Sequence, residues 1–157
     1  MPVVFRIGTD TPDYTADDLT GEGARITGGR WNRKGVPLIN ASESRALACL
    51  ETAVHLSGGA LPLNRYLVEI ELPESTWQAR EVFDRLTSIG WDARPAGKAS
   101  MDWGSDWARD RRSLVAEVPS VLVPEESNLL INPLHPDIRL VRASKIRLFE
   151  YDGRLWM

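Results

Sequence analysis

Arg30 and Glu51 are the two charged side chains whose surroundings in the sequence favour chemistry. Arg30 follows the pair Gly28-Gly29, and glycines in a turn allow the backbone to approach a ligand closely. A guanidinium can hold a phosphate or a carboxylate through two parallel hydrogen bonds. The segment Arg25 to Lys34 carries further basic residues, so the alternative is a solvated basic loop that pairs with some of the chain's 22 acidic residues. Residue types alone favour that alternative.

Glu51 lies in a segment whose apolar residues recur at helical spacing. At about 100° per residue, Leu47, Leu50 and Val54 form one stripe, and Glu51 falls on its border. A half-buried carboxylate there must have its charge compensated or used. The alternative is a surface glutamate that points into water or pairs with a basic neighbour. Together, Arg30 and Glu51 suggest a site for a phosphorylated ligand with an electrophilic centre.

Several other kinds of site are excluded by the motifs. The chain has no G-x-x-x-x-G-K-[ST] phosphate loop and no G-x-S-x-G nucleophile turn, and the run from Gly21 to Ile26 lacks the third glycine of a dinucleotide fingerprint. His55 and His135 are far apart in the sequence without a cysteine cluster, which argues against a metal site. Cys49, the single cysteine, is interpreted as a small buried hydrophobe.

Length and composition are typical of one globular domain, which we expect to span residues 1–157. No apolar run approaches the roughly 20 residues of a membrane span, and no signal pattern follows Met1, so a cytoplasmic protein is expected. The net charge of −3 argues against a general nucleic-acid binder. The six tryptophans are expected to serve mainly in packing.

The elements that must position these residues can be assigned from periodicity. Strands are expected at residues 3–7, 36–39, 65–72, 114–123 (interrupted at Pro119) and 146–151. Helices are expected after an N-cap at Ser42 through to His55, ending at Ser57-Gly58-Gly59, and at residues 82–88 and 101–112. Residues 8–29 and 124–139 are expected to be loops. Because strands outnumber helices and do not alternate with them, the predicted fold class is α+β.

A series of short motifs extends over nearly the whole chain. It comprises Gly21-x-Gly23-Ala24, Gly28-Gly29-Arg30-Trp31-Asn32, Ala48-Cys49-Leu50-Glu51 with Val54-His55, Val118-Pro119-Ser120-Val121, Glu126-x-Asn128, Ile131-Asn132-Pro133-x-His135-Pro136 and Tyr151-Asp152-x-Arg154-Leu155. In this order the motifs resemble the RES domain, the toxin half of bacterial Xre–RES toxin–antitoxin modules. Arg30, Glu51 and Ser120 match the three letters of the family name.

The resemblance implies an ADP-ribosyltransferase-like fold, with mixed, mostly antiparallel sheets and flanking helices, that binds NAD⁺ as substrate. It implies cleavage of the nicotinamide–ribose bond, with hydrolysis, phosphorolysis or transfer of ADP-ribose to a host protein, and growth arrest. Glu51 would stabilise the transition state, Arg30 would bind the pyrophosphate and Ser120 would position the nicotinamide ribose. The alternative for Ser120 is a strand-end serine bonded to its own backbone. No metal is expected.

Asn40 is the one departure from the family pattern. It stands where the family usually places a tyrosine that would contact NAD⁺, and asparagine keeps a hydrogen bond but lacks the aromatic face. Either the pocket works in an altered form or the chain is an inactivated variant.

The resemblance also implies a partner, an Xre-type helix-turn-helix antitoxin that blocks the active site. From the hydropathy and the net charge, neither a membrane nor a nucleic acid is expected as a direct ligand of this chain. The rival hypothesis is a non-catalytic anion- or RNA-binding module built on the segment Arg25 to Lys34. In that case Trp31 would stack on a base, although packing under the loop is the expected role of this ring.

Overall fold

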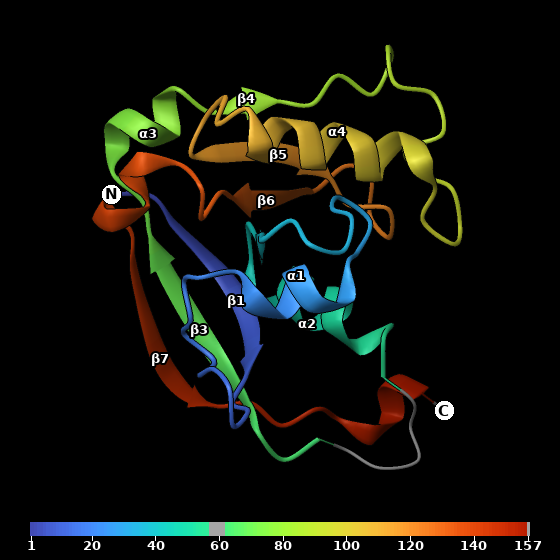
Figure 1. Cartoon of the computed structure of the whole chain (residues 1–157). Coiled ribbons are helices and arrows are strands. Elements are labelled where there is room, and N and C mark those ends of the chain that lie inside the picture. Colours follow the sequence, from blue (N-terminus) through green and yellow to red (C-terminus); the bar gives the residue numbers. More distant parts are fainter. Residues whose placement is uncertain (57–61, 157) are drawn as a thin grey trace.

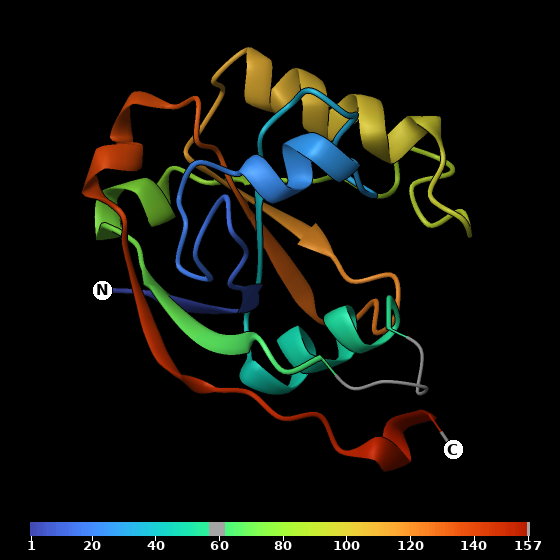
Figure 2. The same cartoon turned by 60° about the horizontal axis from the view of Figure 1, so that its bottom comes forward.

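The computed structural model describes residues 1–56 and 62–156, and among these residues the strands form one twisted sheet (Figures 1 and 2). The sheet has seven strands in the order β4-β5-β6-β2-β1-β3-β7. All neighbouring strands are antiparallel except β4 and β5, which are parallel. The expected α+β class with a mostly antiparallel sheet is therefore confirmed.

The twist divides the sheet into two parts. In Figure 1, β4, β5 and β6 run across the upper half beside α4, whereas β1, β3 and β7 run steeply through the lower left. The strands are β1 (Val3–Thr9), β2 (Ile39–Ser42), β3 (Arg65–Glu71), β4 (Glu81–Val82), β5 (Val115–Pro119), β6 (Ser127–Ile131) and β7 (Arg142–Leu148). The helices are α1 (Glu22–Thr27), α2 (Arg45–Ala53), α3 (Glu74–Gln78) and α4 (Lys98–Arg109), with short 3-10 turns η1 (Pro136–Leu140) and η2 (Gly153–Trp156).

The strands and helices with clear periodicity were predicted well. β1, β3, β5 and α4 overlap the expected segments, and β1 pairs with β3 along its whole length, from Val3↔Glu71 to Thr9↔Arg65. β2 begins three residues after the start of the strand expected at 36–39. β7 begins four residues before the start of the strand expected at 146–151. The helix expected to run through His55 ends earlier, at Ala53, with Val54 as its C-cap. The expected stop signal Ser57-Gly58-Gly59 lies outside the described residues.

Four expectations are corrected by the structure. The expected loop 8–29 contains α1, which begins after Gly21 without a side-chain cap. The expected loop 124–139 contains the turn η1 and the strand β6, whose two polar residues are followed by three apolar ones and so show no alternation. The expected helix 82–88 is instead the end of β4 and a turn in which the Asp84 carboxylate accepts from Leu86 N–H. The helix expected from Ser42 begins at Arg45, and its N-cap is Ser44, whose hydroxyl accepts from Leu47 N–H.

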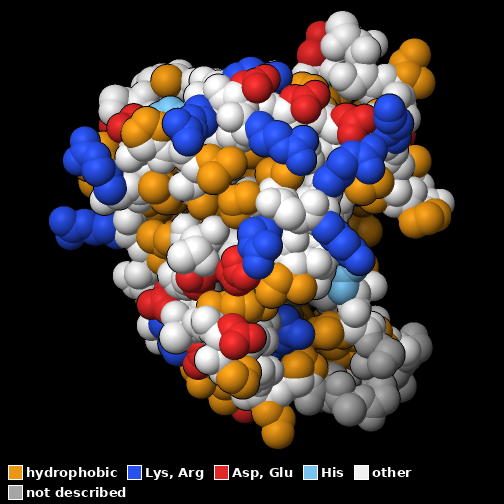
Figure 3. Space-filling model, in the orientation of Figure 1, with side chains coloured by type: hydrophobic (Ala, Val, Ile, Leu, Met, Phe, Trp, Pro, Cys, Tyr) orange, Lys and Arg blue, Asp and Glu red, His pale blue; other side chains and the backbone are white. Residues whose placement is uncertain are grey.

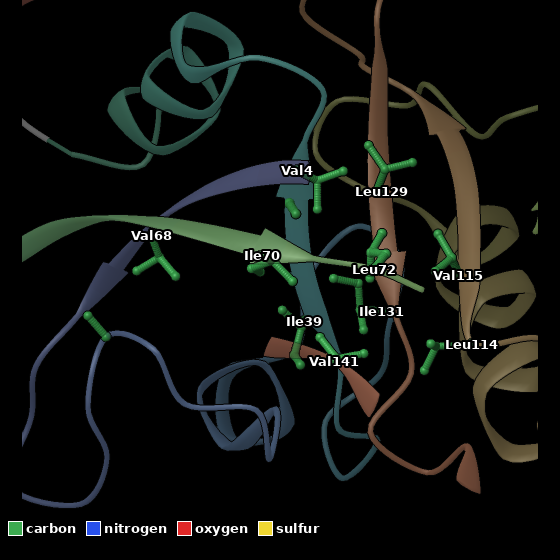
Figure 4. Packing of buried hydrophobic residues seen from close by; sticks show 12 residues of the cluster. Val4, Ile39, Val68, Ile70, Leu72, Leu114, Val115, Leu129, Ile131 and Val141 are labelled. Carbon is green, nitrogen blue, oxygen red and sulfur yellow. The ribbon is translucent and has the colours of Figure 1, made fainter. Parts of the chain in front are cut away.

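The buried hydrophobic residues of the described chain form three clusters. One lies around β2, β3 and β6 (Figure 4) and includes Ile39, Val68, Ile70, Leu129 and Ile131. A second cluster joins α4 to β5 and β6. It contains Trp31, Trp91 and Trp107, and Trp103 packs against it. A third, smaller cluster packs α2 against β1 and β3 through Ile7, Ala48, Ala53, Leu67 and Tyr151.

Candidate active site

The loop that carries Arg30 is held in shape from both sides. Gly28 follows α1 with a φ of 68°, a conformation that favours glycine. The side chain of Asn32 is 1% exposed and donates from Nδ2 to Ala24 O at 2.8 Å and to Val36 O at 2.9 Å. The Asn32 amide therefore closes the loop and fixes the residues on either side of Arg30.

Trp31 anchors this loop in the core, as expected from its sequence. Its ring is 4% exposed and packs edge-on against Phe83, with ring centroids 4.9 Å apart, and against Trp103. Its backbone also lies directly over Gly104 of α4, where a Cβ atom would come 1.8 Å from Trp31 O. Trp31 is a packing residue, and its buried ring has no free face on which a base could stack.

The Arg30 guanidinium is held by a second loop. Its Nη1 donates to Trp91 O at 2.8 Å and to Ala93 O at 2.9 Å. Within the described part of the chain its Nε and Nη2 have no hydrogen-bond partner. Partial burial lowers the pKa of Arg30 from its ordinary value, while the charge of Glu51 acts in the opposite direction. Arginine stays protonated at neutral pH in any case, so one edge of the guanidinium fork is charged and free to bind an anion.

The other basic residues of the segment behave differently from Arg30. Arg25 pairs with Glu22 on α1, and Arg33 pairs with Asp102 of α4 at 2.5 Å. The alternative of a basic loop paired with acids is therefore correct for Arg25 and Arg33. Arg30 instead bonds to backbone carbonyls and lies near Glu51.

Helix α2 buries a different face from the one that the sequence predicts. Its buried residues are Leu47, Ala48 and Ala53, whereas Leu50 and Val54 are 36% and 52% exposed. The small alanines let the helix pack closely on β1 and β2, and this contact turns Leu50 and Val54 outward. Glu51 is half-buried, as expected.

Ser120 and Glu51 are joined directly although 69 residues separate them in the sequence. The Ser120 hydroxyl donates to Glu51 Oε1 at 2.7 Å and accepts from the backbone N–H groups of Leu122 and Val123, each at 3.1 Å. Its side chain is fully buried. The Ser120 hydroxyl therefore bonds both to the backbone of its own turn and to the Glu51 carboxylate. It points at Glu51 rather than into open space.

Ser120 owes its position to the end of β5. Pro119, which cannot donate to a neighbouring strand, is the last residue of β5 and pairs with Ser127 of β6. The two-residue β4 pairs with β5 only as far as Glu117, so the missing N–H of Pro119 lies beyond the partner strand. The expectation of a break beside Ser120 is confirmed.

Asn40 lies on β2, on the face of the sheet against which α2 packs. Its neighbours Ile39 and Ala41 belong to the core cluster on the opposite face, and side chains alternate along a strand. Asn40 is exposed, and its backbone oxygen accepts from Arg6 Nη1 at 3.0 Å. Its side chain makes no hydrogen bond among the described residues.

The elements that carry Arg30, Glu51 and Ser120 come together at one place on the surface. In Figure 1 the loop after α1, the turn after β5 and the end of α2 meet at the right of the view, where the surface in Figure 3 is indented. Two open surface cavities lie elsewhere. One of about 240 Å³ is lined by Glu43, Trp77 and Glu117, and another of about 230 Å³ includes Arg112 and His135.

The sequence reasoning did not select Arg94, a residue of the loop that holds Arg30. Its Nη2 donates to Val121 O at 2.9 Å, next to Ser120. The surrounding residues show neither a glycine pair nor a periodic pattern, so nothing in the sequence marks this arginine.

Cys49 is partly buried, and burial raises the pKa of its thiol. This environment disfavours a thiolate nucleophile. Within residues 1–56 and 62–156, no three His, Cys, Asp or Glu side chains are grouped as metal ligands, and no helix is long and apolar enough to cross a bilayer.

Comparisons with known proteins identify the family of the chain. A Prs ADP-ribosylating toxin from Sphingobium sp. (strain YBL2) is 56% identical over 152 residues, which cover 96% of this chain and 94% of that protein. A Toxin Res from Yersinia enterocolitica is 39% identical over 143 residues, covering 90% and 93%. The toxin–antitoxin complex MbcT–MbcA of M. tuberculosis contains a chain of similar fold, with a TM-score of 0.55 and 17% identity over 98% of this chain and 86% of that one. The RES domain model matches residues 3–152, and the chain therefore belongs to the RES domain family.

Proposed function

We propose that this chain is the toxin of a toxin–antitoxin module and that it cleaves the nicotinamide–ribose bond of NAD⁺. The observation that carries the proposal is the Ser120–Glu51 hydrogen bond of 2.7 Å beside an arginine whose guanidinium has a free edge. The names of the relatives, an ADP-ribosylating toxin and a Toxin Res, support the same reading. The proposed domain spans residues 1–157.

Each residue has a role in this reaction. The free Nε and Nη2 of Arg30 bind the pyrophosphate through charge-assisted hydrogen bonds. Glu51 stabilises the positive charge that develops on the ribose as the bond from C1′ to nicotinamide breaks. The electron pair of that bond returns to the ring nitrogen, which starts positively charged, so the leaving group needs no proton. A single carboxylate is therefore sufficient.

Ser120 acts through Glu51. Because its hydroxyl is buried and bonded to Oε1, it fixes the carboxylate rather than contacting the ribose. The reaction ends when an oxygen of water, phosphate or a host protein forms a bond to C1′ and releases its proton. The 56% identity to an ADP-ribosylating toxin favours a protein acceptor among these.

The rival RNA- or anion-binding module is less well supported. Two of the basic residues on which it depends, Arg25 and Arg33, are paired with acids, and the ring of Trp31 is buried. We propose an antitoxin as the natural partner, because a chain of similar fold is found in a toxin–antitoxin complex. An Xre-type protein that covers the surface around Arg30 and Glu51 fits this role.

The test is the release of free nicotinamide from NAD⁺, measured by chromatography with and without phosphate. The assay compares the natural chain, Asn40→Tyr, and Asn40→Tyr combined with Glu51→Gln or Arg30→Gln. Asn40 is exposed and its side chain makes no hydrogen bond within the described residues, so we expect Asn40→Tyr to break no side-chain contact there. Activity that depends on Glu51 and Arg30 supports the proposal.

Arg33→Gln is the matched control, because Arg33 lies in the same loop but pairs with Asp102, and this variant should retain activity. If neither the natural chain nor Asn40→Tyr releases nicotinamide under any condition, the proposed reaction is wrong. If Asn40→Tyr is no more active than the natural chain, the idea that Asn40 inactivates the protein fails.

A further inference from the structure

The loop between β4 and α4 contributes a second arginine beside Arg30. Arg94 directly follows Ala93, whose carbonyl oxygen accepts from Arg30 Nη1 at 2.9 Å. On its other side, Arg94 Nη2 donates to Val121 O at 2.9 Å, one residue beyond the serine that holds Glu51. Arg94 is exposed, and its guanidinium is held next to the turn that carries Ser120.

Each of the two guanidiniums keeps nitrogen atoms that form no hydrogen bond within the described residues. Arg30 uses Nη1 for backbone carbonyls, whereas Arg94 uses Nη2. Within the described residues, neither side chain forms an ion pair with an acid. Burial is the main cause of the lowered pKa of Arg30, and the positive charge of Arg94 lowers this pKa further. A ligand with two adjacent negative charges would relieve the repulsion between these two positive charges.

A pyrophosphate carries one negative charge on each of two linked phosphate groups, which matches two neighbouring arginines. We infer that Arg94 is a second substrate-binding residue, which binds one phosphate of a dinucleotide pyrophosphate while Arg30 binds the other. This inference rests on the proposed NAD⁺ site. It also explains why the loop that bears Arg94 is held by Arg30, since one arginine positions the backbone of the next.

The chain offers a matched control in the same loop. Arg85 also donates to a backbone carbonyl of the turn after β5, from Nη2 to Pro124 O at 3.0 Å. Its guanidinium lies over the ring of Trp91, 5.8 Å from the centroid. Arg85→Gln thus removes a similar link between the loop and the turn without removing the charge beside Arg30.

The experiment measures binding of ADP-ribose and of AMP by titration calorimetry, independently of any NAD⁺ turnover. Arg94→Gln should weaken ADP-ribose binding about five- to tenfold and AMP binding less, because AMP has a single phosphate. Arg94→Lys, which keeps the charge but lacks the fork, should be intermediate, and it replaces the glutamine variant if that fails to fold. Arg85→Gln should bind ADP-ribose like the natural chain.

Three results would overturn the inference: unchanged affinity in Arg94→Gln, an equal loss in Arg85→Gln, or no binding of ADP-ribose by the natural chain. Nicotinamide release by Asn40→Tyr is measured separately. If NAD⁺ is cleaved while Arg94→Gln binds normally, the reaction stands and the role of Arg94 does not. If ADP-ribose binding depends on Arg94 while NAD⁺ is never cleaved, the proposed reaction fails and the binding site stands.

Discussion

The hydrogen bond between Ser120 and Glu51 predicts a measurable coupling between two residues that lie on different elements. Ser120→Ala removes one hydrogen bond to a carboxylate, at 2.7 Å, and two from backbone N–H groups, at 3.1 Å each. A neutral hydrogen bond contributes about 0.5–1.5 kcal/mol, and one to a charged group about 1.5–3 kcal/mol. Because Glu51 and the turn are only partly buried, water replaces part of this energy. We expect Ser120→Ala to lower the free energy of unfolding by about 2–4 kcal/mol.

The assay is urea unfolding followed by tryptophan fluorescence, on the natural chain, Ser120→Ala, Glu51→Ala and the double variant. Residues in direct contact show non-additive effects, and we expect a coupling energy of about 1–2 kcal/mol for this pair. Ser127→Ala is the control, because its hydroxyl contacts Glu117 at the long distance of 3.4 Å. That variant should lose less than about 1 kcal/mol.

Additive losses within about 0.5 kcal/mol would refute the reasoning. They would mean that Ser120 stabilises only its own turn and does not hold Glu51. The proposed positioning role of Ser120 would then lose its basis even if the variant were less active.

Three further predictions concern the supports of the site and the pH dependence of stability. Gly104→Ala should destabilise the protein by about 3 kcal/mol or more, because its Cβ would come 1.8 Å from Trp31 O and the loop of Arg30 would have to move. Tyr151→Phe should lower the free energy of unfolding by about 1 kcal/mol, because the phenol lies 2.6 Å from the hydroxyl of Thr52 in α2. Burial raises the pKa of the Tyr151 phenol. The contribution of this phenol to stability is therefore full below pH ~10 and is lost as the pH rises through the folded pKa. The hydrogen bond from Lys145 lowers the pKa of Asp10. The contribution of the Asp10 carboxylate to stability is therefore present above pH ~3.9 and is lost as the pH falls through the folded pKa. Asp10→Asn should flatten that part of the curve of stability against pH.

Each of these has its own check by urea unfolding. Gly97→Ala, at the start of the same helix as Gly104, has its nearest neighbour at 3.5 Å from the added Cβ, and an equal loss there would contradict the argument from close packing. For Tyr151, an alkaline limb that is the same in the phenylalanine variant would be inconsistent with the raised pKa. For Asp10, Lys145→Gln should flatten the curve only in part, because the Ala16 N–H still donates to the Asp10 carboxylate. A curve that keeps its full slope between pH ~2 and ~4 in both variants would disprove the assignment.

The sequence determined those elements whose side chains repeat with a clear period. β1 and β3 alternate over their length and were predicted within two residues at each end, and the order of the RES motifs identified the family. It failed for β6, which has only five residues: two polar ones followed by three apolar ones in a row, so that no period of two is visible. It also failed for α1, whose six residues begin without a side-chain cap.

For the candidate site, the sequence likewise indicated some features and the tertiary structure decided others. Arg30, Glu51 and Ser120 could be selected from residue type and motif, but their relations could not. α2 is amphipathic with two possible apolar faces, and only its contact with β1 and β2 decided that Leu50 and Val54 face outward while Glu51 meets Ser120. Arg94 reaches the site through a hydrogen bond to Val121, 27 residues further along the chain. Periodicity reports only which neighbours in sequence share a face, whereas a contact between distant segments depends on how the elements pack, and that is decided by the tertiary structure.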